Sequence, residues 1–221
     1  MSDASTWSIL IPTISQRADL FRRLLDVLLP QLDEHGGRVR VLAWWNNGHP
    51  SLPEIRQALV RDAGTDYVSF VDDDDLVVGD FVGAIVAALA SRPDHVGYQV
   101  AYHVDGELKE ICDHSLRHRR WYRDRVNGLC RDVTHLDPIR RDLALRADFR
   151  QARRGHAEDR VWVAQVRRFL RTEEYIPRVL YHYLWSETGS AWQRPDRLQA
   201  VGARPVVDHP YFAWHPECAD G

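Results

Sequence analysis

The sequence has little lysine, little cysteine and no long apolar run. Lys109 is the only lysine, and with a formal net charge of −3 the chain carries no overall basic field that would indicate nucleic-acid binding. The three cysteines, Cys112, Cys130 and Cys218, are odd in number and lack C-x-x-C spacing. This favours reduced thiols in a cytoplasmic setting over a disulfide framework or a zinc site.

Targeting signals are also missing. Residues 1–8 lack the charged and apolar regions of a signal peptide, and no apolar run approaches the length of a membrane span. We therefore expect a soluble, cytoplasmic protein without a membrane span. With 221 residues, 44% of them hydrophobic, the chain is long enough for one domain with a full core. Its oligomeric state is left open.

One stretch carries an unusual concentration of charge. The β-branched and aromatic run at 67–71 predicts a buried strand, and it ends in four consecutive aspartates, Asp72 to Asp75. Adjacent carboxylates repel one another and are costly to desolvate without a counter-charge. Carboxylate oxygens are suitable ligands for Mg²⁺, Mn²⁺ or Ca²⁺. The alternative is a solvated acidic turn, with Asp75 as the N-cap of the next helix.

The first half of the chain alternates strands with helices. Strands are expected at 7–11, ended by Pro12, and at 39–45 and 67–71. Helices are expected from Ser15 or Asp19 to Leu32, and at 52–63 and 79–90. This alternation predicts an α/β fold with a mainly parallel sheet. Ligands of such sheets bind at the carboxyl ends of the strands, where Thr13, Asn46 and the four aspartates lie.

The second half is less regular. A hairpin is expected at 97–104 and 107–112, with its turn at Asp105-Gly106. A short helix is predicted at 141–146, a longer one from Glu158 to Leu170, and a last strand region at 175–185. Residues 187–221 have no periodicity, and we expect an irregular tail there.

Five phrases of the sequence then carry a resemblance. In order, they are 9–13 (ILIPT), 70–75 (FVDDDD), 134–141 (THLDPIRR), 158–159 (ED) and 180–183 (LYHY). Together they resemble the GT-A glycosyltransferases of the family 2 type, and in particular a subset common in phages and bacteria.

The resemblance implies a fold and a division of the chain. It implies a GT-A fold, which is a Rossmann-like, mainly parallel sheet with helices on both faces, over residues 1–186. Within it, 7–112 would be the nucleotide-sugar-binding half and 113–186 the acceptor and catalytic half. Residues 187–221 would be a C-terminal extension. A phage-encoded member would work in the host cytoplasm.

The resemblance also implies a metal site. Asp72 and Asp74 match the two aspartates of the family's DXD motif, which contact the donor and the metal that bridges its diphosphate. Asp75 is an additional candidate ligand, and Asp73 fills the variable position of the motif. His182 matches a late histidine that reaches the metal or the diphosphate in many GT-A enzymes. The expected cofactor is Mn²⁺ or Mg²⁺.

Other matches concern the donor nucleotide and the catalytic base. Thr13 and Arg17 match the turn that borders the nucleotide base, and Arg56 matches a basic position near the nucleotide. Asn46 or Asn47 stands where the family often has an acidic residue that reads uracil. Asp159, with Glu158 beside it, matches the catalytic base. Without the resemblance, these two carboxylates would only complement the dipole of the helix that they begin.

The acceptor is not specified by any motif. The arginine-rich segment 117–125 also contains Trp121 and Tyr122, so it is either a solvated loop or a surface for a diphosphate or an acidic, stackable acceptor such as nucleic acid. His135 and His156 flank the predicted site and are otherwise ordinary surface residues.

We therefore expect a metal-dependent, inverting glycosyltransferase with a nucleotide-sugar donor, a UDP-sugar. The acceptor hydroxyl would belong to a glycan, a protein or a modified base of phage DNA. The alternatives are a non-catalytic nucleotide- or glycan-binding module and a nucleotidyltransferase. The first strand lacks a following glycine-rich loop with a lysine, which counts against a nucleotidyltransferase.

Overall fold

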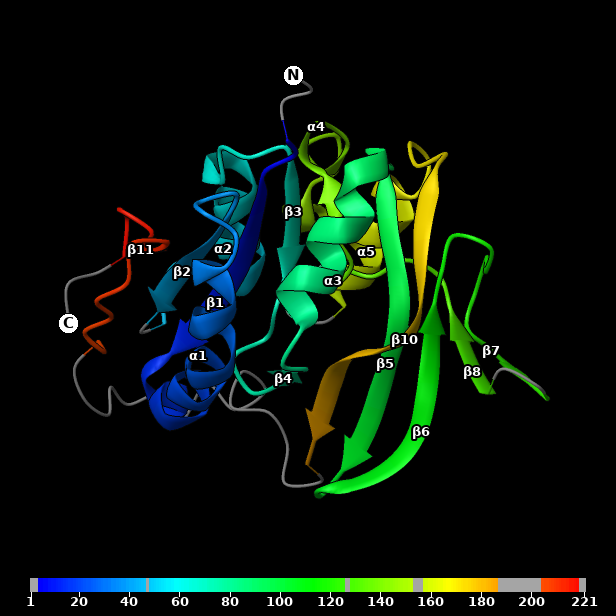
Figure 1. The fold of residues 1–221 in the computed structure, drawn as a ribbon, viewed down its shortest axis with the longest axis horizontal. Coiled ribbons are helices and arrows are strands. Elements are labelled where there is room, and N and C mark those ends of the chain that lie inside the picture. The colour runs from blue at the N-terminus through cyan, green and yellow to red at the C-terminus, as the bar shows by residue number, and fades with distance from the viewer. Residues whose placement is uncertain (1–3, 47, 126–127, 153–156, 187–203, 219–221) are drawn as a thin grey trace.

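The computed structural model describes residues 4–46, 48–125, 128–152, 157–186 and 204–218. They form one mixed sheet with helices on both faces, so the predicted α/β fold is confirmed (Figure 1). Strand order along the sheet is β11-β2-β1-β3-β9-β5-β6-β8-β7, and β10 pairs with both β4 and β5.

The first half follows the predicted alternation of strands and helices. Strands β2, β1 and β3 are parallel neighbours, and the helices between them cross from one strand end back to the other. The elements are β1 (Trp7–Ile14), α1 (Ala18–Asp33), β2 (Val39–Asn46), α2 (Leu52–Asp62) and β3 (Tyr67–Phe70).

Pro12 does not end the first strand, contrary to our expectation. Strand β1 continues through it to Ile14, and Pro12 pairs with Trp44 of β2. The carbonyl of Leu10 accepts a hydrogen bond from the backbone N–H of Val71. Because backbone groups alternate in direction along a strand, those of Pro12 face the same side as those of Leu10, toward β3. Strand β3 ends at Phe70 and does not extend beside Pro12. The missing N–H of the proline therefore costs no hydrogen bond to a neighbouring strand, and the strand can continue.

The rest of the sheet is mixed in direction. The predicted hairpin is confirmed as the antiparallel pair β5 and β6, while β10 lies parallel to β5. The elements are β4 (Leu76–Val77), α3 (Phe81–Ala88), β5 (His95–Val104), β6 (Glu107–His114), β7 (Tyr122–Asp124), β8 (Gly128–Arg131), β9 (Ile139–Arg140), α4 (Arg141–Ala144), α5 (Glu158–Val166), β10 (Glu173–Trp185) and β11 (Phe212–Trp214).

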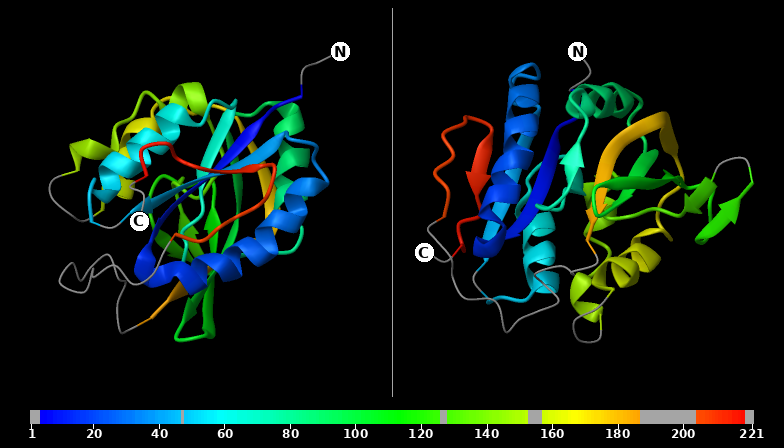
Figure 2. Two further views of the ribbon diagram at one scale, coloured as in Figure 1. Left: turned by 90° about the vertical axis from the view of Figure 1, so that its left-hand side faces the viewer. Right: turned by 90° about the horizontal axis from the view of Figure 1, so that it is seen from below.

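Several expected boundaries differ from the structure, and one strand was not expected. The third helix spans Phe81–Ala88 and tightens into a single 3₁₀ turn at Leu89–Ser91, and the helix that begins at Glu158 ends at Val166. The expected tail contributes a strand, because Phe212–Trp214 pairs in parallel with β2. Figure 2 shows this segment along one end of the sheet, with β7 and β8 at the other.

Two apolar cores hold the helices to the sheet. On one face, Trp7 and Tyr98 pack with Phe21 of α1 and Phe81 of α3. On the other face, α2, α4 and α5 cover buried residues that include Leu10, Trp44, Trp45, Phe149 and Trp162. Helices therefore cover both faces, and β1, β2 and β3 all point their carboxyl ends toward the lower side of the molecule in Figure 1.

Candidate active site

A cleft of about 820 Å³ lies at this edge of the sheet. Its walls come from the acidic turn after β3, the start of α5 and the end of β10. The lining residues include Arg17, Arg56, Asp72, Asp73, Asp74, Asp75, Trp121, Arg131, His135, Glu158, Asp159 and Tyr183.

Arg17 holds two of the four aspartates. It lies in the single 3₁₀ turn after β1, where its Nη1 is 2.6 Å from Asp73 Oδ1 and its Nη2 is 2.8 Å from Asp74 Oδ2. Asp73 is buried, whereas the Asp74 side chain is 28% exposed and faces the cleft. Asp73 therefore anchors the turn, and Asp74 is the more accessible carboxylate.

Asp72 lies between a guanidinium and an imidazole. Its Oδ1 is 2.9 Å from Nη2 of Arg56, and its Oδ2 is 3.4 Å from Nε2 of His135. Burial raises the pKa of Asp72, but the charges of Arg56 and His135 outweigh it and bring that pKa well below its ordinary value. Asp72 is therefore ionised over the physiological pH range.

Asp75 is fixed from β10. Its Oδ2 accepts a hydrogen bond of 2.7 Å from the Tyr181 hydroxyl, and its Oδ1 accepts one of 2.7 Å from the backbone N–H of Leu184. The same hydroxyl accepts a bond of 3.1 Å from the backbone N–H of Asp72. Tyr181 thus holds both ends of the acidic turn.

The aspartates carry more negative charge than their arginines neutralise. Burial, together with the charges of Asp73 and Asp72, raises the pKa of Asp74 to about 7 despite the opposing charge of Arg17. Burial and the charges of Asp72 and Asp74 also raise the pKa of Asp75 well above its ordinary value. A divalent cation would relieve this repulsion, and partly exposed carboxylate oxygens are the ligands that Mn²⁺ and Mg²⁺ prefer.

Two further carboxylates face the aspartates across the cleft. Glu158 and Asp159 begin α5, and Glu158 Oε1 is 3.2 Å from Nη1 of Arg56. Asp159 Oδ2 is 3.9 Å from both His135 Nδ1 and Arg131 Nη2. Burial raises the pKa of Asp159, but the charges of His135 and Arg56 lower it overall. Asp159 therefore presents an ionised carboxylate to the cleft.

Three residues that the sequence assigned to the site do not line the cleft. Thr13 is fully buried beside Asp73. Asn46 is buried and bonds the turn after β2, donating to the carbonyl of Pro50 at 3.1 Å and accepting from the N–H of Gly48 at 3.1 Å. The side chain of His182 is 3.1 Å from His103 instead.

The alternation of side chains along β10 explains the position of His182. Tyr181 bonds Asp75 and Tyr183 lines the cleft, so the residue between them points to the opposite face of the strand. In this arrangement the two tyrosines of the LYHY phrase face the acidic turn. A metal-binding role for His182 requires this strand to change its orientation.

The arginine-rich segment contributes an aromatic side chain to the cleft. Arg117 pairs with Asp113, and Arg123 pairs with Glu110 at 2.6 and 2.8 Å. Of the segment 117–125, only Trp121 is among the lining residues. It is 44% exposed and has the guanidinium of Arg131 4.0 Å from its ring centroid and that of Arg160 5.4 Å away. Asn47 and His156 lie outside the described residues.

Several residues of the cleft were not recognised in the sequence. Arg131 of β8 lies 3.9 Å from Asp159 of α5, a contact that no local pattern reveals. Tyr181 and Tyr183 carried a usable signal, since alternating tyrosines in a strand share one face. The sequence analysis placed His135 only beside the predicted site. In the structure it lies between Asp72 and Asp159.

Comparisons with known proteins identify the fold. No protein-family model matches the sequence, and no curated protein matches it. Among solved structures, S. aureus TarS 1-349 in complex with UDP-GlcNAc is similar, with a TM-score of 0.61 and 14% identity over 85% of this chain. The complex of the same protein with UDP gives a TM-score of 0.54 and 13% identity over 82%.

These similarities define the architecture of the chain as the GT-A fold, as the sequence predicted. The aligned region spans 60% and 61% of the TarS 1-349 chains in these two complexes. None of the helices in the described part of the chain is long and apolar enough to cross a membrane.

Proposed function

We propose that this chain is a metal-dependent, inverting glycosyltransferase that moves a sugar from a UDP-sugar to an acceptor hydroxyl. The observation that carries the proposal is the meeting of Asp72 and Asp74 with Asp159 in one cleft, at the edge of the sheet where α/β folds bind ligands. The solved complexes of the structurally similar protein with UDP and UDP-GlcNAc support a uridine nucleotide.

The acidic turn supports the metal dependence. Asp74 and Asp72 are the aspartates with partly exposed side chains, at 28% and 21%, and both line the cleft. They would hold Mn²⁺ or Mg²⁺, which supplies positive charge to the departing diphosphate. Asp75 has both oxygens in hydrogen bonds from Tyr181 and Leu184, so we assign it to shaping the turn.

Arginines of the chain add to this positive charge. Arg17 and Arg56 both line the cleft and are held by carboxylates, so their positions are fixed before a ligand arrives. Preorganised cations of this kind stabilise charge that develops in a transition state without reorganising at that moment. We assign both residues to the donor diphosphate, and Thr13 and Asn46 to supporting the strand ends from within the core.

Asp159 is the proposed general base. It is ionised, it lies across the cleft from the acidic turn, and Arg131 and His135 hold it at 3.9 Å each. A base there takes the proton of the acceptor hydroxyl as the sugar, with an oxocarbenium-like transition state, leaves the diphosphate. Attack from the face opposite the leaving group inverts the anomeric configuration. Glu158 orients Arg56 in this account.

The acceptor would enter beside Trp121. Its exposed ring, with the guanidinium groups of Arg131 and Arg160 near it, offers a face for a sugar ring or a nucleobase. The arginines 117 and 123 are already paired with carboxylates, which weakens the argument for a nucleic-acid acceptor along 117–125. We therefore specify the acceptor only as a hydroxyl compound that stacks on this ring.

The function is tested by supplying Mn²⁺ with a panel of nucleotide sugars and measuring the free nucleotide. Release of nucleoside diphosphate, strongest for UDP-sugars and abolished by EDTA, is the expected result. Release of pyrophosphate from a nucleoside triphosphate and a sugar phosphate would indicate a nucleotidyltransferase instead. Binding of UDP-sugar without any turnover, in the presence of a broad set of acceptors, would indicate a binding module.

A further inference from the structure

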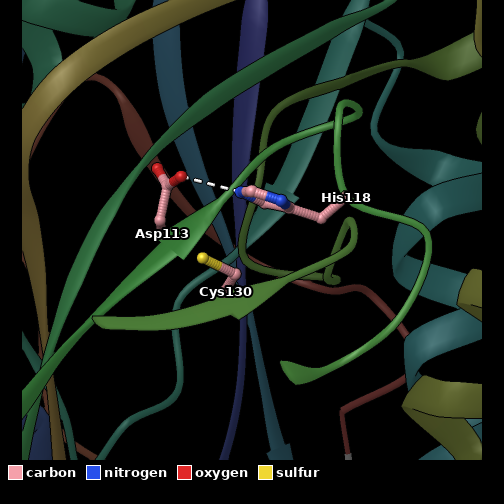
Figure 3. A group of neighbouring side chains, drawn as sticks. All are labelled: Asp113, His118 and Cys130. Atoms are coloured by element: carbon pink, nitrogen blue, oxygen red, sulfur yellow. Dashed lines mark hydrogen bonds and ion pairs between the residues drawn. The ribbon is translucent and has the colours of Figure 1, made fainter. Parts of the chain in front are cut away.

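Three potential metal ligands meet away from the cleft, at the end of the sheet formed by β6, β8 and β7. They are Asp113 of β6, His118 of the following loop and Cys130 of β8, and all three are buried (Figure 3). One ligand atom from each lies within 4.8 Å of the other two. A carboxylate, an imidazole and a thiol rarely share a buried point without a reason, because each is costly to desolvate.

From this geometry we infer that Asp113, His118 and Cys130 form a zinc-binding site. Mixed sulfur, nitrogen and oxygen ligands suit Zn²⁺, whereas Mg²⁺ and Mn²⁺ prefer oxygen ligands alone. The site is therefore chemically distinct from the all-carboxylate turn at Asp72 to Asp75, and it is independent of the function proposed for that turn. Three protein ligands leave the fourth tetrahedral position to a water molecule.

The ligand atoms need only small movements to reach tetrahedral zinc. Zinc–ligand bonds of about 2.0–2.3 Å place the ligand atoms roughly 3.3–3.7 Å from one another. His118 Nε2 and Asp113 Oδ2 are 2.7 Å apart and joined by a hydrogen bond, so a metal would take the place of the shared proton and widen this pair slightly. The thiol of Cys130 would lose its proton to solvent and move inward by side-chain rotation.

Groups that orient the ligands are already in place. The Tyr122 hydroxyl is 2.9 Å from His118 Nδ1, and the Tyr175 hydroxyl donates to Asp113 Oδ1. With zinc on Nε2, the ring proton resides on Nδ1 and donates to Tyr122. Such hydrogen bonds from the second ring nitrogen fix the orientation of metal-bound histidines in general.

Arg117 opposes a cation here, because its guanidinium contacts Asp113 Oδ2. Its side chain is 49% exposed and also lies over the ring of Tyr175, at 4.4 Å from the centroid. It can therefore leave the carboxylate and remain on the aromatic ring. The bound metal would join β6, β8 and the loop between them, which is the base from which Trp121 reaches the cleft.

The test uses Co²⁺ as a spectroscopic substitute for Zn²⁺. Chelator-treated protein is titrated with Co²⁺, and we expect an intense near-ultraviolet thiolate-to-cobalt absorption that saturates at one equivalent and disappears when one equivalent of Zn²⁺ is added. The carboxylates of the cleft cannot produce a sulfur absorption, so the signal does not arise from the cleft. Absence of the band in the wild-type protein would overturn the zinc site and leave a hydrogen-bonded network.

Matched variants locate the sulfur ligand. Cys130→Ser should abolish the band, whereas Cys218→Ser, which changes another buried free cysteine on the far side of the sheet, should retain it. Tyr122→Phe should keep the band and weaken zinc affinity by about 10–100-fold, the usual effect of losing a group that orients a ligand. A band that survives in Cys130→Ser, or zinc affinity equal to wild type in His118→Gln, would contradict the assignment.

Discussion

The hydroxyl of Tyr181 donates to Asp75 at 2.7 Å and accepts from the backbone N–H of Asp72 at 3.1 Å, so a single side chain of β10 closes the acidic turn. This tyrosine is fully buried, and no water can take over its bonds. The turn therefore keeps its shape although its carboxylates repel one another. The position of the proposed metal ligands depends on a residue that touches neither metal nor donor.

Replacing Tyr181 with phenylalanine tests this arrangement. Tyr181→Phe leaves a buried carboxylate oxygen and a backbone N–H without their partner, so the free energy of unfolding should fall by about 1–3 kcal/mol. Urea unfolding monitored by circular dichroism measures the change. Tyr183 lies on the same strand but is partly exposed. Tyr183→Phe should therefore lower the free energy of unfolding less, because water can bond any group that loses the hydroxyl. Equal losses in the two variants would argue against the special role of Tyr181.

We expect Arg56 to contribute to the stability of the fold through its contacts with two carboxylates. It is almost fully buried between Asp72 at 2.9 Å and Glu158 at 3.2 Å, so Arg56→Met removes a cation from both carboxylates and leaves Asp72 with His135 alone of the two groups that flank it. Removing one partner of a buried ion pair typically costs about 3–5 kcal/mol. Arg56→Lys retains the charge but cannot contact both carboxylates at once, and a smaller loss in urea unfolding is expected. A loss below about 1 kcal/mol in Arg56→Met would contradict this account.

Asp74 should control metal-dependent nucleotide binding. Asp74→Asn should weaken UDP binding in the presence of Mn²⁺ by at least about tenfold, or ~1.4 kcal/mol, in isothermal calorimetry. The fold should persist, because the substitution removes one of four repelling charges. Asp80→Asn is the control, since Asp80 lies outside the cleft and pairs with Arg178. UDP binding by Asp74→Asn that matches wild type and ignores EDTA would refute the metal assignment.

A buried histidine gives the stability a defined pH dependence. His95 lies between Glu173 at 3.1 Å and Asp137 at 3.3 Å. Burial lowers its pKa, but the hydrogen bonds and charges of the two carboxylates outweigh this and raise it to about 9 from the model-compound value of 6.5. Since folding raises this pKa, the protonated ring stabilises the fold fully below pH 6.5, and the contribution is lost as the pH rises through 9.

Comparison with His95→Gln isolates that contribution. The difference in unfolding free energy between wild type and variant should be largest at pH 6 and shrink toward pH 9.5, as measured by urea unfolding at several pH values. Taking the difference removes the titration of all other groups. A difference that stays constant, or that grows with pH, would show that His95 is neutral in the folded protein.

The sequence was a good guide to the elements of the first half. Strong hydrophobic periodicity and clear turn residues located β1, β2, β3 and the helices between them, and the acidic turn stood out because such charge is unusual after a buried strand. It was a poorer guide to β11. Three residues are too few to show a period, and Phe212–Trp214 becomes a strand only because the edge of β2 is available to pair with it.

Side-chain neighbours across the cleft could not be predicted in the same way. Asp159 meets His135 and Arg131 through the packing of α5 against the sheet, and Trp121 enters the cleft through the pairing of β7 with β8. These contacts join residues that are distant in sequence and obey no periodic pattern. The direction of the His182 side chain is set by the alternation of side chains along β10, which a motif match does not contain.

The most direct test of the proposed function separates donor binding from transfer in Asp159→Asn. Asparagine has nearly the shape of aspartate but cannot take a proton, so the variant should bind UDP and Mn²⁺ as wild type does while sugar transfer falls by about 10²–10⁴-fold. Glu158→Gln should lose less, and the product should have inverted anomeric configuration. Transfer by Asp159→Asn at nearly the wild-type rate, or retention of configuration in the product, would contradict the account.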